Sequence, residues 1–149
     1  MKNVGFKIYS DWMEFGYSET LYSWFSTICY RLENSKWGSR FPVVMNNFYY
    51  DEKNGVKFED LEKFKNELKT IKDEFSKLSV KDAIWSFEEN IYNVPNNKPN
   101  LNYNADNLSN FYVNIRMKSI YDVFDILIED MNYYKTNCII VVEEKALLK

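Results

Sequence analysis

The side chains that could carry out chemistry in this sequence are mainly carboxylates, because the chain contains 22 aspartates and glutamates but no histidine. Histidine is the usual general base near neutral pH, a common metal ligand and the partner of many catalytic nucleophiles. A glycoside hydrolase needs instead two carboxylates held across a cleft. Adjacent carboxylates occur at Glu88 with Glu89, Glu129 with Asp130 and Glu143 with Glu144. Neighbours on a strand point to opposite faces, so we interpret these pairs as solvated charges and predict no catalytic residue.

The sequence also predicts no metal and no cofactor. Its segment DEKNGVKFED superficially resembles a calcium-binding loop, but the acids do not follow the EF-hand register and Gly55 is misplaced. With only four glycines, the chain contains no Gly-rich phosphate loop. Cys29 and Cys138 lie far apart in apolar runs. We interpret them as buried thiols in a reducing cytosol, although a disulfide between them stays possible from the sequence alone.

Aromatic and basic residues gather in the stretch SKWGSRFPVVMNNFYY. In a structural interpretation, Trp37 and Phe41 seal the edge of the core while Arg40 pairs with an acid. In a functional interpretation, the stretch is a recognition patch, because Trp, Tyr and Arg dominate the hot spots of protein interfaces. The two interpretations are compatible. Trp37, Arg40, Tyr49 and Tyr50 are therefore candidate partner-binding residues.

A second group of candidate binding residues is acidic. Asp122, Asp125, Glu129 and Asp130 lie on one predicted helix with few lysines nearby. Asp122 and Asp125 are three residues apart, and Asp125 and Glu129 are four apart, so they share a helix face. These acids are either ordinary solvated charges or a surface that steers a basic partner.

The elements that position these residues follow from hydrophobic periodicity. Four strands, four helices and one long asparagine-rich loop predict an α+β fold, in which three to four helices cover a small sheet of about four strands. The segment SDWMEFGYS is expected to be a connection, Ser18 a helix N-cap, and Ser119 with Asp122 a capping box. The expected strands span residues 4–9, 82–89, 111–116 and 136–142, and the expected helices span 19–33, a short turn from Pro42, 59–78 and a segment after Ser119.

Composition sets the class of the protein. A chain of 149 residues with 46% apolar and 28% charged residues predicts one globular domain over residues 1–149. A net charge of -3 argues against a nucleic-acid partner. The N-terminal residues lack the continuous apolar run of a signal peptide, and no stretch is long enough to span a membrane. We therefore expect a cytoplasmic protein.

Two segments of the sequence are WFSTICYRLENSKWGSRFPVVMNNFYY and the run FEDLEKFKNELKTIKDEFSKL. Together they resemble the immunity protein 70 family of bacterial polymorphic toxin systems. The resemblance rests on FSTICYRLE and WGSRFPVVMNNFY, and extends more loosely through AIWSFEE and LSNFYVNIRMKSIYDVFDILIEDM, so that it covers most of the chain. It implies a small cytoplasmic protein that is not an enzyme and that binds and neutralises a cognate toxin domain.

The resemblance implies inhibition by stoichiometric occlusion of the toxin. If the toxin is a nuclease, its substrate groove is basic, and the acids at 122–130 would imitate phosphates there. Two alternatives remain from the residues alone. One is an interaction or adaptor module that uses the long helix as a docking surface, and the other is a small carboxylate-dependent hydrolase.

Overall fold

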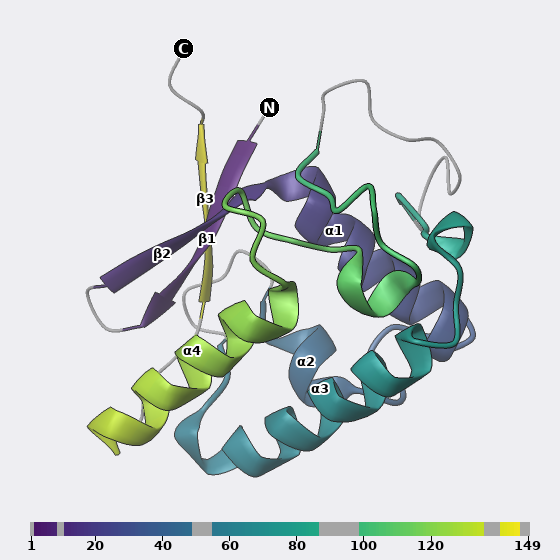
Figure 1. Ribbon diagram of the computed structural model, residues 1–149. Helices are drawn as coiled ribbons and strands as arrows, with labels where there is room; N and C mark the ends of the chain where they lie inside the picture. The colour runs from purple at the N-terminus through teal and green to yellow at the C-terminus, as the bar shows by residue number, and fades with distance from the viewer. Residues whose placement is uncertain (1, 9–10, 49–54, 87–98, 136–140, 147–149) are drawn as a thin grey trace.

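The computed structural model describes residues 2–8, 11–48, 55–86, 99–135 and 141–146 (Figure 1). Its sheet has three strands in the order β2–β1–β3, namely β1 (Lys2–Ile8), β2 (Asp11–Tyr17) and β3 (Val141–Ala146). Both pairs of strands are antiparallel. The fold is α+β as predicted, but the described residues form three strands where about four were expected. Figure 1 shows the helices gathered beside and below this sheet.

Strand β2 corrects the expectation that SDWMEFGYS is a connection. It pairs with β1 from Asn3 opposite Tyr17 to Ile8 opposite Asp11, with a bulge between Val4 and Gly5. The strand is hard to recognise in the sequence because bulky apolar and aromatic residues occupy both of its faces, so the polar alternation of a half-buried strand is missing. Gly5 lets the strands approach, since an added Cβ would lie 2.4 Å from the carbonyl oxygen of Met13.

The first predicted helix is confirmed. Helix α1 (Ser18–Thr27) continues into a π-helical turn (Ile28–Leu32), and together they span residues 18–32, against the expected 19–33. Ser18 is the first helical residue rather than the N-cap, which is Tyr17 without a side-chain capping bond. Cys29 is buried with a free thiol. Its burial, and to a lesser extent the nearby charge of Glu33, raises the pKa of that thiol to about 11. Cys138 lies outside the described residues.

Two further predicted helices are also present. Helix α2 (Pro42–Asn46) begins at Pro42, whose missing N–H costs nothing in a first turn. A short 3₁₀ turn (Phe58–Asp60) leads into α3 (Leu61–Phe75), within the expected range 59–78. The apolar seam of α3 is buried in the core at Leu61, Phe64, Leu68, Ile71 and Phe75. Because the core occupies the seam, the long helix does not offer it as a docking surface.

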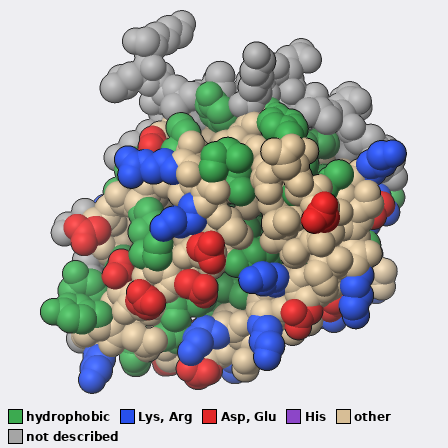
Figure 2. All heavy atoms as spheres, in the orientation of Figure 1, with side chains coloured by type: hydrophobic (Ala, Val, Ile, Leu, Met, Phe, Trp, Pro, Cys, Tyr) green, Lys and Arg blue, Asp and Glu red, His purple; other side chains and the backbone are tan. Residues whose placement is uncertain are grey.

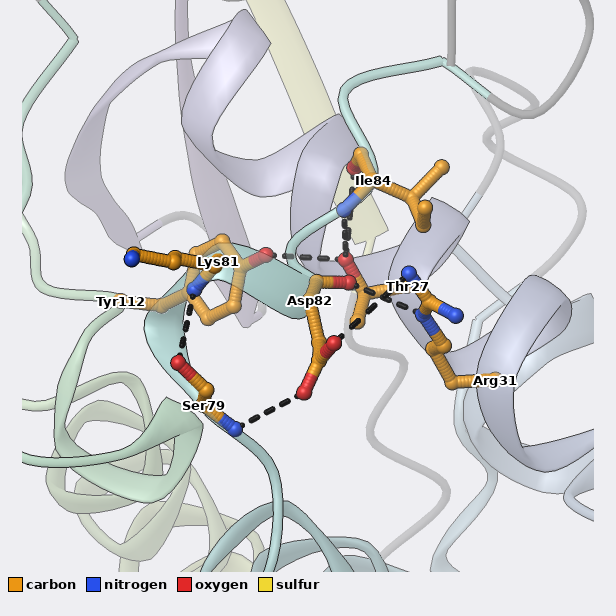
Figure 3. Close-up of polar contacts among 7 residues, drawn as sticks. All are labelled: Thr27, Arg31, Ser79, Lys81, Asp82, Ile84 and Tyr112. Atoms are coloured by element: carbon orange, nitrogen blue, oxygen red, sulfur yellow. Dashed lines mark hydrogen bonds and ion pairs between the residues drawn. The ribbon is translucent and has the colours of Figure 1, made fainter. Parts of the chain in front are cut away.

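The strand expected at 82–89 is absent from residues 83–86. The N–H of Ile84 donates to the hydroxyl of Thr27 over 2.9 Å, and its carbonyl accepts from the hydroxyl of Ser23 over 2.8 Å. The hydroxyl of Tyr112 bonds to that of Ser23 at 3.0 Å and to that of Thr27 at 2.9 Å, and Figure 3 shows the contact with Thr27. Side chains from α1 thus satisfy the backbone groups of Ile84 that a neighbouring strand would otherwise bind. Glu88 and Glu89 lie outside the described residues.

The strand expected at 111–116 is also wrong. This segment forms only isolated bridges, from Tyr112 to Leu101 and from Val113 to Ser119. Successive residues pair with two different segments, so no continuous ladder forms. Phe111 and Val113 are buried as predicted, but Ile115, expected on the same inward face, is 44% exposed.

The last helix and last strand were only partly predicted. Helix α4 (Ile120–Tyr134) begins after Ser119, whose hydroxyl accepts from the N–H of Tyr121 over 3.3 Å, so Ser119 is the N-cap but the expected capping box with Asp122 does not form. The strand expected at 136–142 overlaps β3 only at its end, since β3 runs from Val141 to Ala146 and residues 136–140 lie outside the described residues. No helix in the described part of the chain is long and apolar enough to cross a bilayer.

The core lies between the sheet and the helices, with Phe124 of α4 near its centre. Its ring centroid lies 5.2 Å from that of Phe6 on β1, 5.4 Å from Trp24 on α1 and 5.5 Å from Phe64 on α3. One aromatic side chain therefore joins the sheet to three helices, and edge and tilted contacts of this kind add to the burial itself.

The hydroxyl network at Tyr112 gives a first testable prediction. Burial raises the pKa of Tyr112 to about 12, so the group is neutral and acts through hydrogen bonding. We expect Tyr112→Phe to lower the free energy of unfolding in urea by about 1–2 kcal/mol, because the hydroxyls of Ser23 and Thr27 then lose a buried partner. The control Tyr103→Phe, at a residue 74% exposed, should change it by less than about 0.5 kcal/mol. Equal effects of the two substitutions would contradict this role.

Candidate functional site

The loop between α1 and α2 is organised by one buried carboxylate, that of Glu33, which is 3% exposed. Its Oε1 accepts from the N–H of Gly38, and its Oε2 accepts from the N–H groups of Arg40 and Phe41, each over 3.0 Å. Gly38 has φ +76°, and an added Cβ there would lie 2.6 Å from the side chain of Asn46. Residues 33–41 are thereby fixed to the end of the first helix.

Trp37 is part of this loop of residues 33–41. Its indole N–H donates to the carbonyl of Met45 on α2 over 2.7 Å, and its ring stacks on Phe25 of α1 with centroids 6.0 Å apart. Phe41 is buried at 3% exposure. These contacts agree with the structural interpretation, in which the two aromatic side chains seal the edge of the core.

Arg40 joins the same loop to α3. Its guanidinium makes a two-pronged contact with Glu74, with Nη1 to Oε1 at 2.8 Å, and lies 4.8 Å above the ring of Phe41. The hydrogen bond to Glu74 raises the pKa of Arg40 above its ordinary value. The side chain is still 45% exposed, so it remains accessible to a partner while it ties the loop down.

A second carboxylate of α3 holds the start of α2. Glu67 accepts from the N–H of Val44 over 2.9 Å and from that of Val43 over 3.3 Å. Burial raises the pKa of Glu67, and the two backbone hydrogen bonds oppose that rise. One flank of α3 therefore supports the loop and α2 through Glu67 and Glu74. Tyr49 and Tyr50, the other two candidates from this stretch, lie outside the described residues.

The four acids predicted on the last helix are all exposed on α4: Asp122, Asp125, Glu129 and Asp130. None of them forms an ion pair within the described part of the chain. Figure 2 shows acidic side chains gathered over α4 at the lower left, with basic side chains over the neighbouring α3. The structure therefore brings the acids together on the solvent face of α4, separate from the loop of residues 33–41.

A groove of about 310 Å³ separates α4 from α3. Its wall on α3 carries Lys65, Lys69 and Lys72, and its wall on α4 includes Asp125. The ammonium of Lys72 lies 5.7 Å from the ring centroid of Tyr121, within reach of a cation–π contact. Sequence reasoning did not single out these lysines, although their helical spacing places them along one flank of the apolar seam.

A second groove, of about 480 Å³, lies on the opposite flank of α4. Its apolar lining includes Trp12 and Met13 of β2 with Val123 and Ile126 of α4. Its cations are Arg116 and Lys118, from the loop that precedes α4. The acidic face of α4 is thus bordered on both sides by grooves that carry basic residues. Sequence reasoning missed Arg116 and Lys118, because Arg116 was expected to end a strand and Lys118 to lie in the connection after it.

The family model of immunity protein 70 matches residues 6–140. No curated protein and no solved structure matches the chain.

Proposed function

The chain belongs to the immunity protein 70 family, and from that premise we propose that it binds a cognate toxin domain and neutralises it by stoichiometric occlusion. In this proposal the chain acts in the cytoplasm as a single domain and converts no substrate. A preformed surface covers the functional surface of the toxin, so the inhibition lasts as long as the complex does.

The acidic face of α4 is the observation that supports this proposal. Asp122, Asp125, Glu129 and Asp130 project from one helix, and like charges placed so close together destabilise it slightly. A basic partner would relieve that repulsion. If the toxin acts on nucleic acid, its substrate groove is basic, and these carboxylates occupy the places of phosphates.

The direct test of the proposal is neutralisation in cells. The toxin domain encoded next to this chain is expressed with and without it, and growth and complex formation are measured. We expect growth to be restored only when the chain is present, and a one-to-one complex in size-exclusion chromatography with light scattering. Continued toxicity in cells that contain the folded chain in excess would contradict the proposal.

Electrostatic steering by α4 gives a more specific prediction. We expect the double variant Asp125→Lys and Glu129→Lys to associate with the toxin domain at least about tenfold more slowly at low salt. The difference should shrink as salt screens the charges. Stopped-flow or surface-plasmon measurements give the association rates.

The matched control for steering is Glu59→Lys with Glu62→Lys. These two exposed acids lie at the start of α3, and their reversal changes the net charge by the same amount. The control should retain nearly the association rate of the wild type. An identical slowing in both double variants would mean that net charge alone, rather than the face of α4, governs the encounter.

A further inference from the structure

The loop of residues 114–118, between the Tyr112 network and α4, is closed by its own hydrogen bonds. The side-chain oxygen of Asn114 accepts from the N–H of Arg116 over 3.0 Å and from that of Lys118 over 2.8 Å. The N–H of Asn114 donates to the carbonyl of Lys118 over 2.8 Å, and that of Met117 donates to the carbonyl of Asn114 over 2.9 Å. Asn114 is buried and thus organises the loop from below.

The same loop is attached to the sheet and to α4. The N–H of Ile115 donates to the carbonyl of Phe15 on β2 over 2.7 Å, and Phe15 is fully buried. On its other side, Val113 bridges to Ser119, the N-cap of α4. The loop therefore has a fixed position before any partner arrives, which lowers the entropy cost of ordering it in a complex.

This rigid loop presents apolar side chains to solvent. Met117 is 59% exposed and Ile115 is 44% exposed. Met117 has φ +65°, a left-handed conformation that is unfavourable for a residue with a Cβ. Scattered exposed hydrophobics are normal on protein surfaces. Two of them on a five-residue loop held by Asn114 make a compact, preorganised projection of the kind that fills a pocket in a partner.

Two residues of the same loop, Arg116 and Lys118, line the groove that borders the acidic face of α4 proposed to meet the toxin. The groove of about 480 Å³ runs from Arg116 and Lys118 on the loop to Val123 and Ile126 on α4. Two cations and the carboxylate of Glu14 thus line the groove at the loop, and four further carboxylates lie along α4. A partner that covers both must carry acidic groups opposite the loop and basic groups opposite the helix. The acids of α4 would repel a phosphate backbone or an anionic membrane, so this pattern fits a protein surface.

We infer that Ile115 and Met117 are the apolar anchor of the toxin-binding face. They insert into an apolar recess of the toxin domain, while Arg116 and Lys118 meet carboxylates at the rim of that recess. This inference rests on the proposed function and adds to it the place, the chemistry and the orientation of the contact. The acids of α4 govern the rate of encounter, and the anchor governs the lifetime of the complex.

The test measures binding of the purified chain to the toxin domain, which is recovered from the wild-type complex by denaturation and refolded. We expect Ile115→Ala with Met117→Ala to raise Kd at least about 100-fold, mainly through faster dissociation. The control Tyr103→Ala removes a larger side chain that is 74% exposed outside this loop, and it should leave Kd within about twofold of the wild type.

A second double variant keeps the test independent of folding. Arg116→Glu with Lys118→Glu leaves intact the loop hydrogen bonds, which involve only the backbone groups of these residues, and should raise Kd at least about tenfold with an unchanged melting temperature. If the wild type binds and both double variants bind as tightly, the anchor is overturned while the proposed function stands. If the wild type itself fails to bind the toxin domain, the proposed function fails, and the anchor with it.

Discussion

The rest of this structure depends on the hydrogen bonds that the buried carboxylate of Glu33 accepts. Burying a carboxylate is costly unless its oxygens are hydrogen-bonded, and here three backbone N–H groups satisfy it. Those three bonds set the path of residues 33–41. Only along that path do Trp37 reach the carbonyl of Met45 and Arg40 reach Glu74. A charge that looks ordinary in the sequence thus fixes how the first helix, α2 and α3 are joined.

The two flanks of helix α3 have different roles: one supports the neighbouring loop and α2, and the other faces solvent. Its apolar seam is buried, and one flank holds the loop and α2 through Glu67 and Glu74. The other flank carries Lys65, Lys69 and Lys72 into the groove beside α4. The residues that attract notice in the sequence, Trp37 and Arg40, belong to the supporting loop of residues 33–41, whereas the charged and apolar features open to a partner border α4.

Helices were predicted well because a buried stripe and a cap are local signals, as Pro42 and Ser119 illustrate. Strands were predicted less well: the first expected strand is confirmed by β1 over residues 4–8, but two others did not form within the described residues, because alternation also arises in irregular segments. The hydroxyls of Ser23 and Thr27 bond to the carbonyl and the N–H of Ile84, which a strand would use to pair with a neighbouring strand. The candidate acids on α4 followed from helical spacing alone. The role of Glu33 depends on the path of the irregular loop that follows it, and the position of Ile115 depends on a hydrogen bond to distant Phe15; neither follows from helical or strand periodicity.

In this account the loop of residues 33–41 supports the fold, and the surface at α4 meets the partner. The most direct test is the variant Glu33→Gln, measured for both stability and binding. A glutamine must turn its NH₂ toward at least one of the three N–H groups. We predict that the free energy of unfolding falls by about 2 kcal/mol or more, since a buried charged acceptor is lost. The folded variant should bind the toxin domain with the Kd of the wild type. Unchanged stability together with a Kd weakened at least about tenfold would contradict the account, because it would place residues 33–41 in the interface.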